Sequence, residues 1–431
     1  MDEKNEKKER IVIVGGGFAG LNLVKKLDKE KFDIILVDKN NFHSFPPLFY
    51  QIASSGLDPS NICFPFRREM RKERAKGARF QLGEVKEVDT AAKTITTQFQ
   101  TIHYDKLIFA AGAKNNFFGN DQLEKYVYTL KSTAEAMRVR NEVLDRLERA
   151  SLSDDDELQR KMLCFVVVGG GPTGVEMAGA LGEMKRDIIP REYPTINPDN
   201  VNIILLEGAD RLLSTMSVDS SIKAKKYLGK LMVEVRLNTK MDSYDQNIVR
   251  LDNGDEIFTS LLIWTAGITA QSFTYTGENL QTAPGGRFPV DNFNRVVGHD
   301  DIFAVGDIAY MPTERFPRGL PQLAQVAIQQ ASLLAKQINS GDFRKEFVYN
   351  DKGSMATVGR NLAVAELPHL KLGGFPAWLT WMFVHLISIL GMRNKANVLL
   401  NWIWEYFTYN TSLRILLHST RYPLRKRWGE N

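Results

Sequence analysis

The chain has 431 residues, enough for about two to four domains that each bury a core of their own. Its hydrophobic content of 43% and charged content of 25% are those of an ordinary globular protein and indicate no particular function. Two cysteines, Cys63 and Cys164, are too few for a disulfide framework or a cysteine-ligated metal site, and they favour a reducing compartment. The net charge of +5 equals the excess of seven basic over two acidic residues from Gly391 onward. No nucleic-acid-binding motif accompanies that segment, so we expect no nucleic-acid partner.

A glycine pattern typical of nucleotide binding lies near the start of the chain, after a charged run in which we predict neither a secretory signal nor a transit peptide. The apolar run Ile11–Val14 predicts a buried strand, and Gly15-Gly16-Gly17-Phe18-Ala19-Gly20 follows it and begins a segment with helical periodicity. The first glycine of such a turn allows the tight bend, the second lets the backbone approach a pyrophosphate, and the third lets the helix pack closely on the strand. The next strand leads to Asp38, where an acid can bind a ribose hydroxyl group.

The same arrangement recurs in mid-chain. The apolar run Phe165–Val168 leads into Gly169-Gly170-Gly171-Pro172-Thr173-Gly174, and a later strand leads to a second acid, Glu207. This acid falls further along than the usual ~20 residues, which we attribute to an insertion at Pro190–Asn200 that is rich in proline and asparagine. A pyrophosphate at each turn lies on free N–H groups at the positive end of a helix. Two dinucleotides are therefore expected to bind side by side.

Shorter signals predict the other elements of these domains. Ser132–Glu135 has the spacing of a capping box and predicts a helix through about Arg149. The pair Asn253-Gly254 predicts a tight hairpin between two strands. The runs Leu107–Ala113 and Leu261–Gly267 each predict a buried strand that ends in small residues, where the backbone can pass close to a cofactor.

One more strand and one helix follow. The segment Asp301–Asp307 predicts a strand, and the carboxylate of Asp307 either accepts a hydrogen bond from a ribityl hydroxyl group or belongs to a plain turn. Residues Gln322–Asn339 predict a helix with Gln325 and Gln329 one turn apart on one face. From the residues alone, these two are expected to be surface glutamines.

The chain changes character after residues 352–367, whose alternation predicts short strands. Phe375–Leu390 is aromatic-rich and nearly uncharged, but a helix of this length extends only about 24 Å, less than the ~30 Å hydrocarbon core of a bilayer. A second apolar stretch, Val398–Phe407, precedes the basic end of the chain. Tryptophans beside apolar faces and basic clusters indicate helices that lie in the interface of an anionic membrane; a dimer interface or a packed core helix is the alternative. His385 is expected to be a packing residue and not a ligand.

Together, these patterns resemble the type II, non-proton-pumping NADH:quinone oxidoreductases of the FAD/NAD(P)-dependent pyridine nucleotide-disulfide oxidoreductase superfamily, over nearly the whole chain. Beyond the glycine turns, the resemblance rests on Pro47-Leu48-Phe49-Tyr50-Gln51, Ala324-Gln325-Val326-Ala327-Ile328-Gln329-Gln330 and Leu390-Gly391-Met392-Arg393-Asn394-Lys395. Met392 stands where a phenylalanine is common in the family. Flavin disulfide reductases carry redox cysteines near Asn41–Gln51, but this segment has none, which argues against dithiol chemistry and against a sulfide-oxidising quinone reductase. Cys63 and Cys164 are therefore expected to be structural.

The resemblance implies an α/β fold with two Rossmann-like domains and an amphipathic C-terminal domain on a membrane. The implied parts are an FAD-binding part at 1–118, an NADH-binding domain at 119–268, a second FAD-binding part at 269–340 and a membrane-associating domain at 341–431. The implied FAD residues are Gly15, Gly17, Phe18, Ala19, Gly20, Asp38, Lys39, Tyr50, Ala111, Gly112, Gly306, Asp307, Ala324 and Gln325. The implied NADH residues are Gly169, Gly171, Pro172, Thr173, Gly174, Glu176, Glu207, Ala266 and Gly267. No metal is expected.

The implied activity is oxidation of NADH by hydride transfer to FAD, followed by reduction of a membrane quinone, either ubiquinone or menaquinone. Gln325 and Gln329 would border the flavin and the quinone, and Glu176 would lie near the nicotinamide, although an acid there also complements the helix dipole. Glu207 favours NADH over NADPH because a carboxylate repels a 2′-phosphate, while the nearby Arg211 weakens this argument.

Two other functions remain open from the sequence. One is a soluble-type flavoprotein reductase or oxidase that uses O₂ or a small electron carrier, and the other is a non-catalytic nucleotide sensor or membrane-bound scaffold. The aromatic and basic C-terminus argues against the first, and the intact glycines and ribose acids argue against the second. We expect a peripheral, monotopic location on the cytoplasmic face of a bacterial inner membrane, with a homodimer left open.

Overall fold

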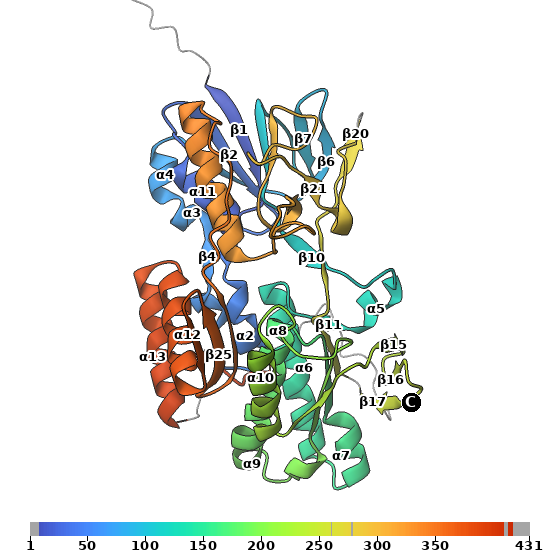
Figure 1. The fold of residues 1–431 in the computed structure, drawn as a ribbon. Helices are drawn as coiled ribbons and strands as arrows, with labels where there is room; N and C mark the ends of the chain where they lie inside the picture. The colour runs from blue at the N-terminus through green and yellow to red at the C-terminus, as the bar shows by residue number, and fades with distance from the viewer. Residues whose placement is uncertain (1–7, 260, 277–278, 409–412, 417–431) are drawn as a thin grey trace, which may run out of the picture. The chain divides into compact units, whose positions relative to one another are not determined.

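The computed structural model describes residues 8–259, 261–276, 279–408 and 413–416 (Figure 1). Packing divides the chain into two compact units, each assembled from three stretches. The first unit contains the residues up to Ser44, Cys63–Asn116 and Ile268–Lys352. The second contains Phe45–Ile62, Phe117–Gly267 and the residues from Gly353 onward. The domain boundaries implied by the sequence follow nucleotide binding rather than packing, and they stay a prediction.

The first unit is built on a five-stranded parallel sheet with the order β22–β9–β1–β2–β5 (Figure 1). Its strands are β1 (Glu9–Val14), β2 (Phe32–Asp38), β5 (Arg79–Leu82), β9 (Lys106–Phe109) and β22 (Ile302–Ala304). Two helices, α1 (Phe18–Lys26) and α11 (Ala324–Ser340), pack against each other. Because all five strands are parallel, their carboxyl ends lie at one edge of the sheet.

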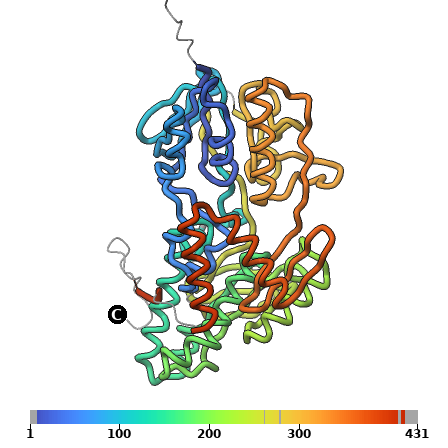
Figure 2. The backbone as a smooth tube through the Cα atoms, turned by 90° about the vertical axis from the view of Figure 1, so that its left-hand side faces the viewer, coloured from blue at the N-terminus to red at the C-terminus, as the bar shows by residue number. Residues whose placement is uncertain are grey.

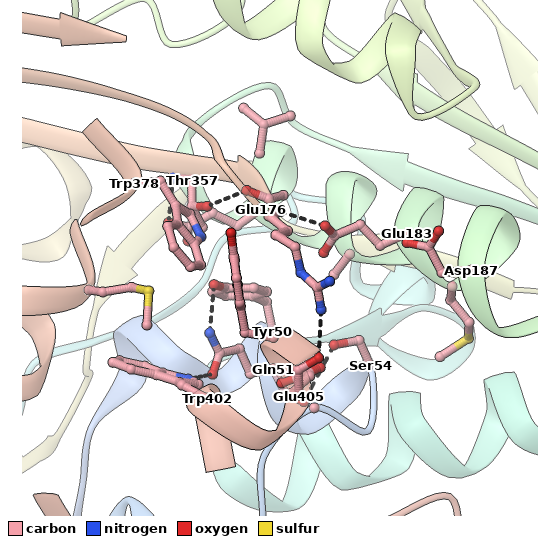
Figure 3. A pocket seen from close by; sticks show the side chains of 18 of the residues that line it. Tyr50, Gln51, Ser54, Glu176, Glu183, Asp187, Thr357, Trp378, Trp402 and Glu405 are labelled. Atoms are coloured by element: carbon pink, nitrogen blue, oxygen red, sulfur yellow. Dashed lines mark hydrogen bonds between the residues drawn. The ribbon is translucent and has the colours of Figure 1, made fainter. Parts of the chain in front are cut away.

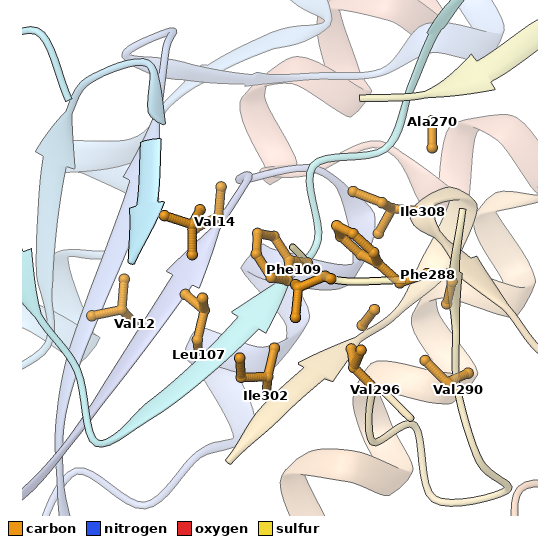
Figure 4. Packing of buried hydrophobic residues seen from close by; sticks show 14 of the residues in the cluster. Val12, Val14, Leu107, Phe109, Ala270, Phe288, Val290, Val296, Ile302 and Ile308 are labelled. Atoms are coloured by element: carbon orange, nitrogen blue, oxygen red, sulfur yellow. The ribbon is translucent and has the colours of Figure 1, made fainter. Parts of the chain in front are cut away.

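The central strand β1 is covered on both faces. All four residues of Ile11–Val14 are at most 5% exposed, as expected for a parallel strand with a continuous apolar sequence. Figure 4 shows Val12, Val14 and Phe109 of this sheet in one core with Phe288. The rings of Phe109 and Phe288 have centroids 4.8 Å apart. The prediction of a buried strand before the first glycine turn is confirmed.

Smaller elements complete the first unit. A four-stranded sheet has the order β20–β6–β7–β8, and three strand pairs, β3–β4, β10–β19 and β21–β23, stand apart from it. Their bounds are β3 (Phe42–Ser44), β4 (Cys63–Pro65), β6 (Val85–Asp89), β7 (Thr94–Thr97), β8 (Thr101–His103), β10 (Ala113–Asn115), β19 (Ile268–Ala270), β20 (Thr274–Thr276), β21 (Phe288–Pro289) and β23 (Ala309–Tyr310). The short helices α3 (Phe66–Glu69) and α4 (Arg71–Ala75) connect β4 to β5.

The second unit repeats the parallel sheet, with the order β11–β18–β12–β13–β14. Its strands are β11 (Tyr128–Thr129), β12 (Cys164–Val168), β13 (Asn202–Leu206), β14 (Val233–Arg236) and β18 (Leu261–Trp264). Its helices include α2 (Phe49–Ala53), α5 (Asp121–Tyr126), α6 (Thr133–Ser151), α7 (Asp156–Met162), α8 (Pro172–Glu183) and α10 (Val218–Lys230). Cys164 is buried at the start of β12, as expected for a structural cysteine.

Two local predictions for this unit are confirmed. The capping box begins α6, where the Ser132 hydroxyl accepts a hydrogen bond from the Glu135 N–H at 3.2 Å. The hairpin at Asn253-Gly254 joins β16 (Ile248–Leu251) to β17 (Glu256–Phe258), and Gly254 has a φ of +89°. A third antiparallel strand, β15 (Met241–Tyr244), pairs with β16.

The segment predicted as an insertion begins in helical structure. Pro190 lies in α9 (Ile189–Glu192), because helical structure continues from α8 through a π-helical turn at Met184–Ile188. A proline is accepted at the first turn of a helix, where its missing N–H has no intrahelical partner. The irregular connection is therefore shorter, and it begins at Tyr193.

The C-terminal part of the second unit consists of a small sheet and two helices. The antiparallel strands β24 (Ser354–Gly359), β25 (Leu362–Leu367) and β26 (Leu370–Gly373) include the short strands predicted in residues 352–367. The helices α12 (Phe375–Ser388) and α13 (Met392–Thr408) follow and contact each other (Figure 2). Among the described residues, no helix combines the length and apolar character needed to cross a membrane. The basic residues predicted at Arg421–Arg427 lie outside the described part of the chain, as does most of the charged run at its start.

Candidate functional site

Four connections of the first unit gather the predicted FAD residues at one edge of its sheet. The glycine turn follows β1, Asp38 ends β2, Ala111 and Gly112 follow β9, and Gly306 and Asp307 follow β22. The carboxyl edge of a parallel α/β sheet is where such folds bind their ligands. The first unit therefore brings together these predicted FAD residues; Lys39 follows Asp38 and is exposed, and Tyr50 belongs to the second unit.

The glycine turn leaves room for a dinucleotide. A Cβ on Gly17 would have no heavy atom within 4 Å, so the backbone is open where a pyrophosphate would pass. A Cβ on Gly20 would lie 1.8 Å from the backbone oxygen of Gly15, so only glycine allows this close approach of helix and turn. Phe18 begins α1, and its ring meets His43 edge-on at 5.4 Å. The turn fits the phosphates of FAD.

Asp38 is bonded to the turn that it adjoins. Its Oδ2 accepts a hydrogen bond from the Gly16 N–H at 2.6 Å, and its Oδ1 accepts one from the Asn40 N–H at 2.7 Å. Burial raises the pKa of Asp38, while these two N–H groups favour the ionised carboxylate. A second residue, not predicted from the sequence, supports the same turn: His43 Nδ1 lies 2.9 Å from the Gly16 carbonyl oxygen.

The connection after β22 is held by glutamines that the sequence reasoning did not single out. Gln330, which is 1% exposed, accepts a hydrogen bond from the Gly306 N–H at 2.8 Å. Gln322 Nε2 donates to the Asp307 carbonyl oxygen at 2.9 Å. Gly306 has a φ of +75°, and its N–H points to the buried amide oxygen of Gln330. The signal available in the sequence was the run of glutamines within and just before α11.

The predicted glutamines of α11 contact another segment of the first unit. Gln325 Oε1 accepts a hydrogen bond from the Lys352 N–H at 3.0 Å. Gln329 exchanges two hydrogen bonds with the backbone of Asn350, at 2.9 and 3.0 Å. Ala324 is the first residue of the helix. The two glutamines share one helix face, as predicted, and they hold the segment 350–352 against it.

The second unit repeats the nucleotide-binding arrangement. Glu207 Oε2 accepts a hydrogen bond from the Gly170 N–H at 2.5 Å, and Oε1 accepts one from the Ala209 N–H at 2.7 Å. A Cβ on Gly171 would have no heavy atom within 4 Å, so this turn is also open to a pyrophosphate. Pro172 and Thr173 begin α8, and Ala266 and Gly267 follow β18 at the same edge of the sheet. These residues fit NADH.

Arg211, which weakened the preference for NADH, is engaged elsewhere. Its guanidinium donates to the carbonyl oxygens of Met216 and Ser214 at 2.8 and 2.7 Å. The Arg211 guanidinium is therefore bonded to backbone oxygens, and the preference of Glu207 for NADH stays a prediction.

Tyr50 and Glu176 lie in the wall of a cavity of about 120 Å³ inside the second unit (Figure 3). The Tyr50 hydroxyl accepts a hydrogen bond from Gln51 Nε2 at 2.9 Å, and Gln51 Oε1 accepts one from Trp402 Nε1 at 3.0 Å. This chain links α2 to α13. Burial raises the pKa of Glu176 to about 8, so the carboxyl group is mostly protonated at neutral pH.

His385 is a packing residue, as predicted. Its ring stacks on Trp381 with centroids 4.0 Å apart, and Nδ1 lies 2.7 Å from the Trp381 carbonyl oxygen. Burial lowers the pKa of His385 to about 4, so the ring is neutral. Within the described residues, no group of three or more histidine, cysteine, aspartate or glutamate side chains could hold a metal ion.

Comparison with known families defines the class. A family described as pyridine nucleotide-disulphide oxidoreductase matches residues 9–331, and one described as the NDH2 C-terminal domain matches residues 352–409. The first match covers most of the chain, including both glycine turns. The protein is therefore a flavoprotein of the pyridine nucleotide-disulphide oxidoreductase class.

Individual relatives narrow this class. The chain is 35% identical over 414 residues to the type II NADH:quinone oxidoreductase NdhA of Mycobacterium tuberculosis. The matched region covers 92% of this chain and 86% of NdhA. It is 30% identical over 439 residues to the mitochondrial internal alternative NAD(P)H-ubiquinone oxidoreductase A1 of Arabidopsis thaliana, with 94% and 85% covered. Its fold is similar to that of NDH2 from Plasmodium falciparum in complex with NADH, with a TM-score of 0.86, 23% identity, and 96% of this chain and 100% of that chain covered. The chain belongs to the type II NADH:quinone oxidoreductases, as the sequence indicated.

Proposed function

We infer that this chain oxidises NADH with a bound FAD and reduces a quinone, without pumping protons. The observation that carries this conclusion is the pair of parallel sheets, each with an open glycine turn after its central strand and an acid bonded to that turn. When bound, FAD supplies the redox chemistry: it accepts a hydride from NADH and returns two electrons to the quinone. The residues of the chain bind and orient these partners.

We assign FAD to the first unit and NADH to the second. Asp38 and Asp307 end parallel strands at the edge where a dinucleotide lies, and they are the acceptors for ribose and ribityl hydroxyl groups. Glu207 takes the corresponding place in the second unit, where its charge disfavours the 2′-phosphate of NADPH. Tyr50 and Glu176, which share one cavity wall, are assigned to the flavin and nicotinamide surroundings.

Gln325 and Gln329 are assigned to the border between flavin and quinone. Their side-chain amides are bonded to the backbone of segment 350–352, which keeps both side chains in defined positions on α11. The quinone is ubiquinone or menaquinone. These residues position the substrate; none of them is required to act as a redox centre.

The C-terminal helices are assigned to a membrane surface. On α13, the side chains at Leu400, Ile403, Trp404 and Phe407 are exposed and follow the spacing of one helix face. On α12, Leu379, Phe383 and Ile387 do the same. Such faces suit a helix that lies in the interface of a bilayer. We propose a monotopic protein on the cytoplasmic face of an inner membrane, with a homodimer as a further assembly.

The test is a stepwise redox titration of the purified full-length protein under anaerobic conditions. We expect a bound flavin whose absorbance band bleaches on addition of NADH and returns on addition of a short-chain quinone. A band that returns only with O₂ or a soluble carrier would show a soluble-type reductase. Absence of a flavin band after reconstitution with FAD would contradict the assignment of the two nucleotide sites.

A further inference from the structure

Four acidic side chains of the second unit line the same cavity: Asp187 and the three glutamates Glu176, Glu183 and Glu405 (Figure 3). Glu176 and Glu183 are seven residues apart on α8, so about two helical turns and ~10 Å separate them along one face of the helix. Glu405 comes from α13. The cavity volume of about 120 Å³ accommodates about four water molecules at ~30 Å³ each.

Arg360 contacts two of these residues, Glu183 and Glu405. Its backbone N–H donates a hydrogen bond to Oε1 of Glu183, and its guanidinium Nη2 donates to the Glu405 carbonyl oxygen at 2.6 Å. The guanidinium also lies 5.0 Å from the ring centroid of Tyr406. The backbone and the side chain of one residue therefore tie the end of α8 to α13 at the cavity.

Trp381 places an indole N–H in the wall of the cavity near Glu176. Trp381 is 2% exposed and lines the cavity, and its indole N–H has no hydrogen-bond acceptor at bonding geometry. The indole lies near enough to Glu176 to favour the ionised form of that carboxyl group. Buried donors in folded proteins are nearly always satisfied by protein or by ordered water. An acceptor for this N–H can come from the Glu176 carboxyl group or from water in the cavity.

Access to water changes along the cavity. Glu176 is 8% exposed, whereas Glu183 and Glu405 are only partly buried, and the neighbouring Arg186 is exposed. Of the three glutamates, Glu183 and Glu405 are therefore the more exposed to solvent, and Glu176 is the most buried. Carboxyl groups and water in a shared cavity are the components of a proton-transfer path.

The surroundings raise the pKa of all three glutamates above its ordinary value. Burial raises the pKa of Glu405 to about 7, and the charge of Glu183 adds to this effect. Burial also raises the pKa of Glu183 above its ordinary value. With the pKa of Glu176 at about 8, the series contains groups that exchange protons near neutral pH.

Other charged groups face the series and partly oppose these shifts. Arg360 and Arg414 lower the pKa of Glu405, and Arg186 and Arg360 lower that of Glu183. Asp187 raises the pKa of Glu183. The Tyr50 phenol stays neutral, because burial raises its pKa well above the ordinary value.

We propose that Glu405 and Glu183, with water in the cavity, relay protons from the surface of the second unit to Glu176 during quinone reduction. The proposal rests on the function proposed above. Reduction of a quinone to a quinol consumes two electrons and two protons; NADH supplies two electrons and one proton as a hydride, and the second proton comes from water. The relay carries this second proton: each carboxyl group releases its proton inward and regains one from the solvent side, so no residue is changed at the end of the cycle.

The test separates the two half-reactions in the FAD-loaded full-length protein. Flavin reduction by NADH and its reoxidation by a short-chain quinone are followed by stopped-flow absorbance from about pH 6 to about pH 9. We expect Glu405→Gln to slow reoxidation by about tenfold and to leave reduction by NADH within about twofold of the wild type. The wild-type reoxidation rate should fall as pH rises through about 7 to about 8, because the donors lose their protons, and the variant should lack the component near 7.

Matched variants keep the result interpretable. Glu405→Asp retains a titratable carboxyl group and should recover most of the rate, and Glu183→Gln should reproduce the defect if Glu405→Gln fails to bind FAD. Glu366→Gln is the control, because Glu366 is a partly buried carboxylate of the same unit that is bonded to Ser217 and Ser220 outside the cavity.

Unchanged reoxidation in both Glu405→Gln and Glu183→Gln would overturn the relay. A raised KM for quinone with unchanged kcat would also overturn it and show a quinone passage instead. A wild-type flavin that NADH cannot reduce, or quinone cannot reoxidise, would refute the proposed function itself.

Discussion

Asp38 and Glu207 are each bonded to the backbone of the glycine turn beside them. The acceptor distances to the Gly16 and Gly170 N–H groups are 2.6 and 2.5 Å. Each carboxylate therefore fixes the turn before a nucleotide arrives, and such preorganisation lowers the cost of binding. The position of both acids could be predicted, because each directly follows an apolar strand, although Glu207 lies further along the chain than the usual ~20 residues.

The discrimination between NADH and NADPH is tested at Glu207. Glu207→Gln removes the negative charge but keeps an oxygen that can accept from the Gly170 N–H. We expect the ratio of kcat/KM for NADH to that for NADPH to fall by about tenfold, equivalent to about 1.4 kcal/mol of lost repulsion. Steady-state rates with both nucleotides check this. Asp210→Asn removes an equal charge three residues away, from an exposed side chain. An equal effect of that control would show that net charge, and not Glu207, sets the preference.

Supporting side chains were the residues that sequence reasoning missed. His43 meets Gly16 across 27 positions of the chain, and Gln330 meets Gly306 across 24. Neither follows a spacing rule, because their partners come from a different element that only the fold brings near. Gln51, which joins Tyr50 to Trp402, spans an even longer separation. A motif within a short stretch of sequence therefore predicts the residues that face a ligand better than it predicts the distant residues that hold those in place.

At the scale of elements, periodicity predicted where helices and strands occur but not how they meet. Strands before both glycine turns, the helix from Thr133 and the helix containing Gln325 all formed where they were predicted. The π-helical turn after α8 was not predicted, because periodicity does not distinguish a single π turn from the α-helix that it continues. The third strand of the C-terminal sheet, β26, was missed because its four residues are too few for a clear alternation.

The packing of α8 on β24 depends on Gly179. A Cβ at this position would lie 1.7 Å from the Val358 carbonyl oxygen, which is a backbone atom and cannot rotate away. We expect Gly179→Ala to destabilise the protein by about 3 kcal/mol through overpacking, or to prevent folding. A drop of about 5–10 °C in Tm by circular dichroism would correspond to this loss.

The matched control for this variant is Gly229→Ala near the end of α10. No heavy atom lies within 4 Å of a Cβ built there, so alanine should be neutral or stabilising by up to about 1 kcal/mol. If both variants unfold at the temperature of the wild type, the contact of α8 with β24 does not have the closeness seen in the structure.

At the scale of the whole molecule, the assignment of chain stretches to units was the least predictable feature. Phe45–Ile62 packs in the second unit, although it directly follows the first nucleotide-binding strands in the sequence. No pattern in its residues predicts which elements it packs against. In the structure, α2 packs on α6 and α8, which lie about a hundred residues further along the chain. Contacts of that range depend on packing in three dimensions, which a single sequence does not reveal.

Attachment to a membrane is also a property of the whole molecule. Leu400 and Phe407 are 63% and 77% exposed on one face of α13, so burial of this face must come from a partner outside the second unit's own core. If the partner is a bilayer, Leu400→Asp with Phe407→Asp should weaken binding to anionic phospholipid vesicles by at least about tenfold, since each side chain loses about 1.5 kcal/mol or more of apolar burial. Vesicle co-sedimentation measures this. Phe99→Asp, at a 65% exposed position of the first unit, should bind as the wild type does. Retained vesicle binding by the double variant, together with a shift from dimer to monomer in analytical ultracentrifugation, would instead identify the face as an interface between two copies of the chain.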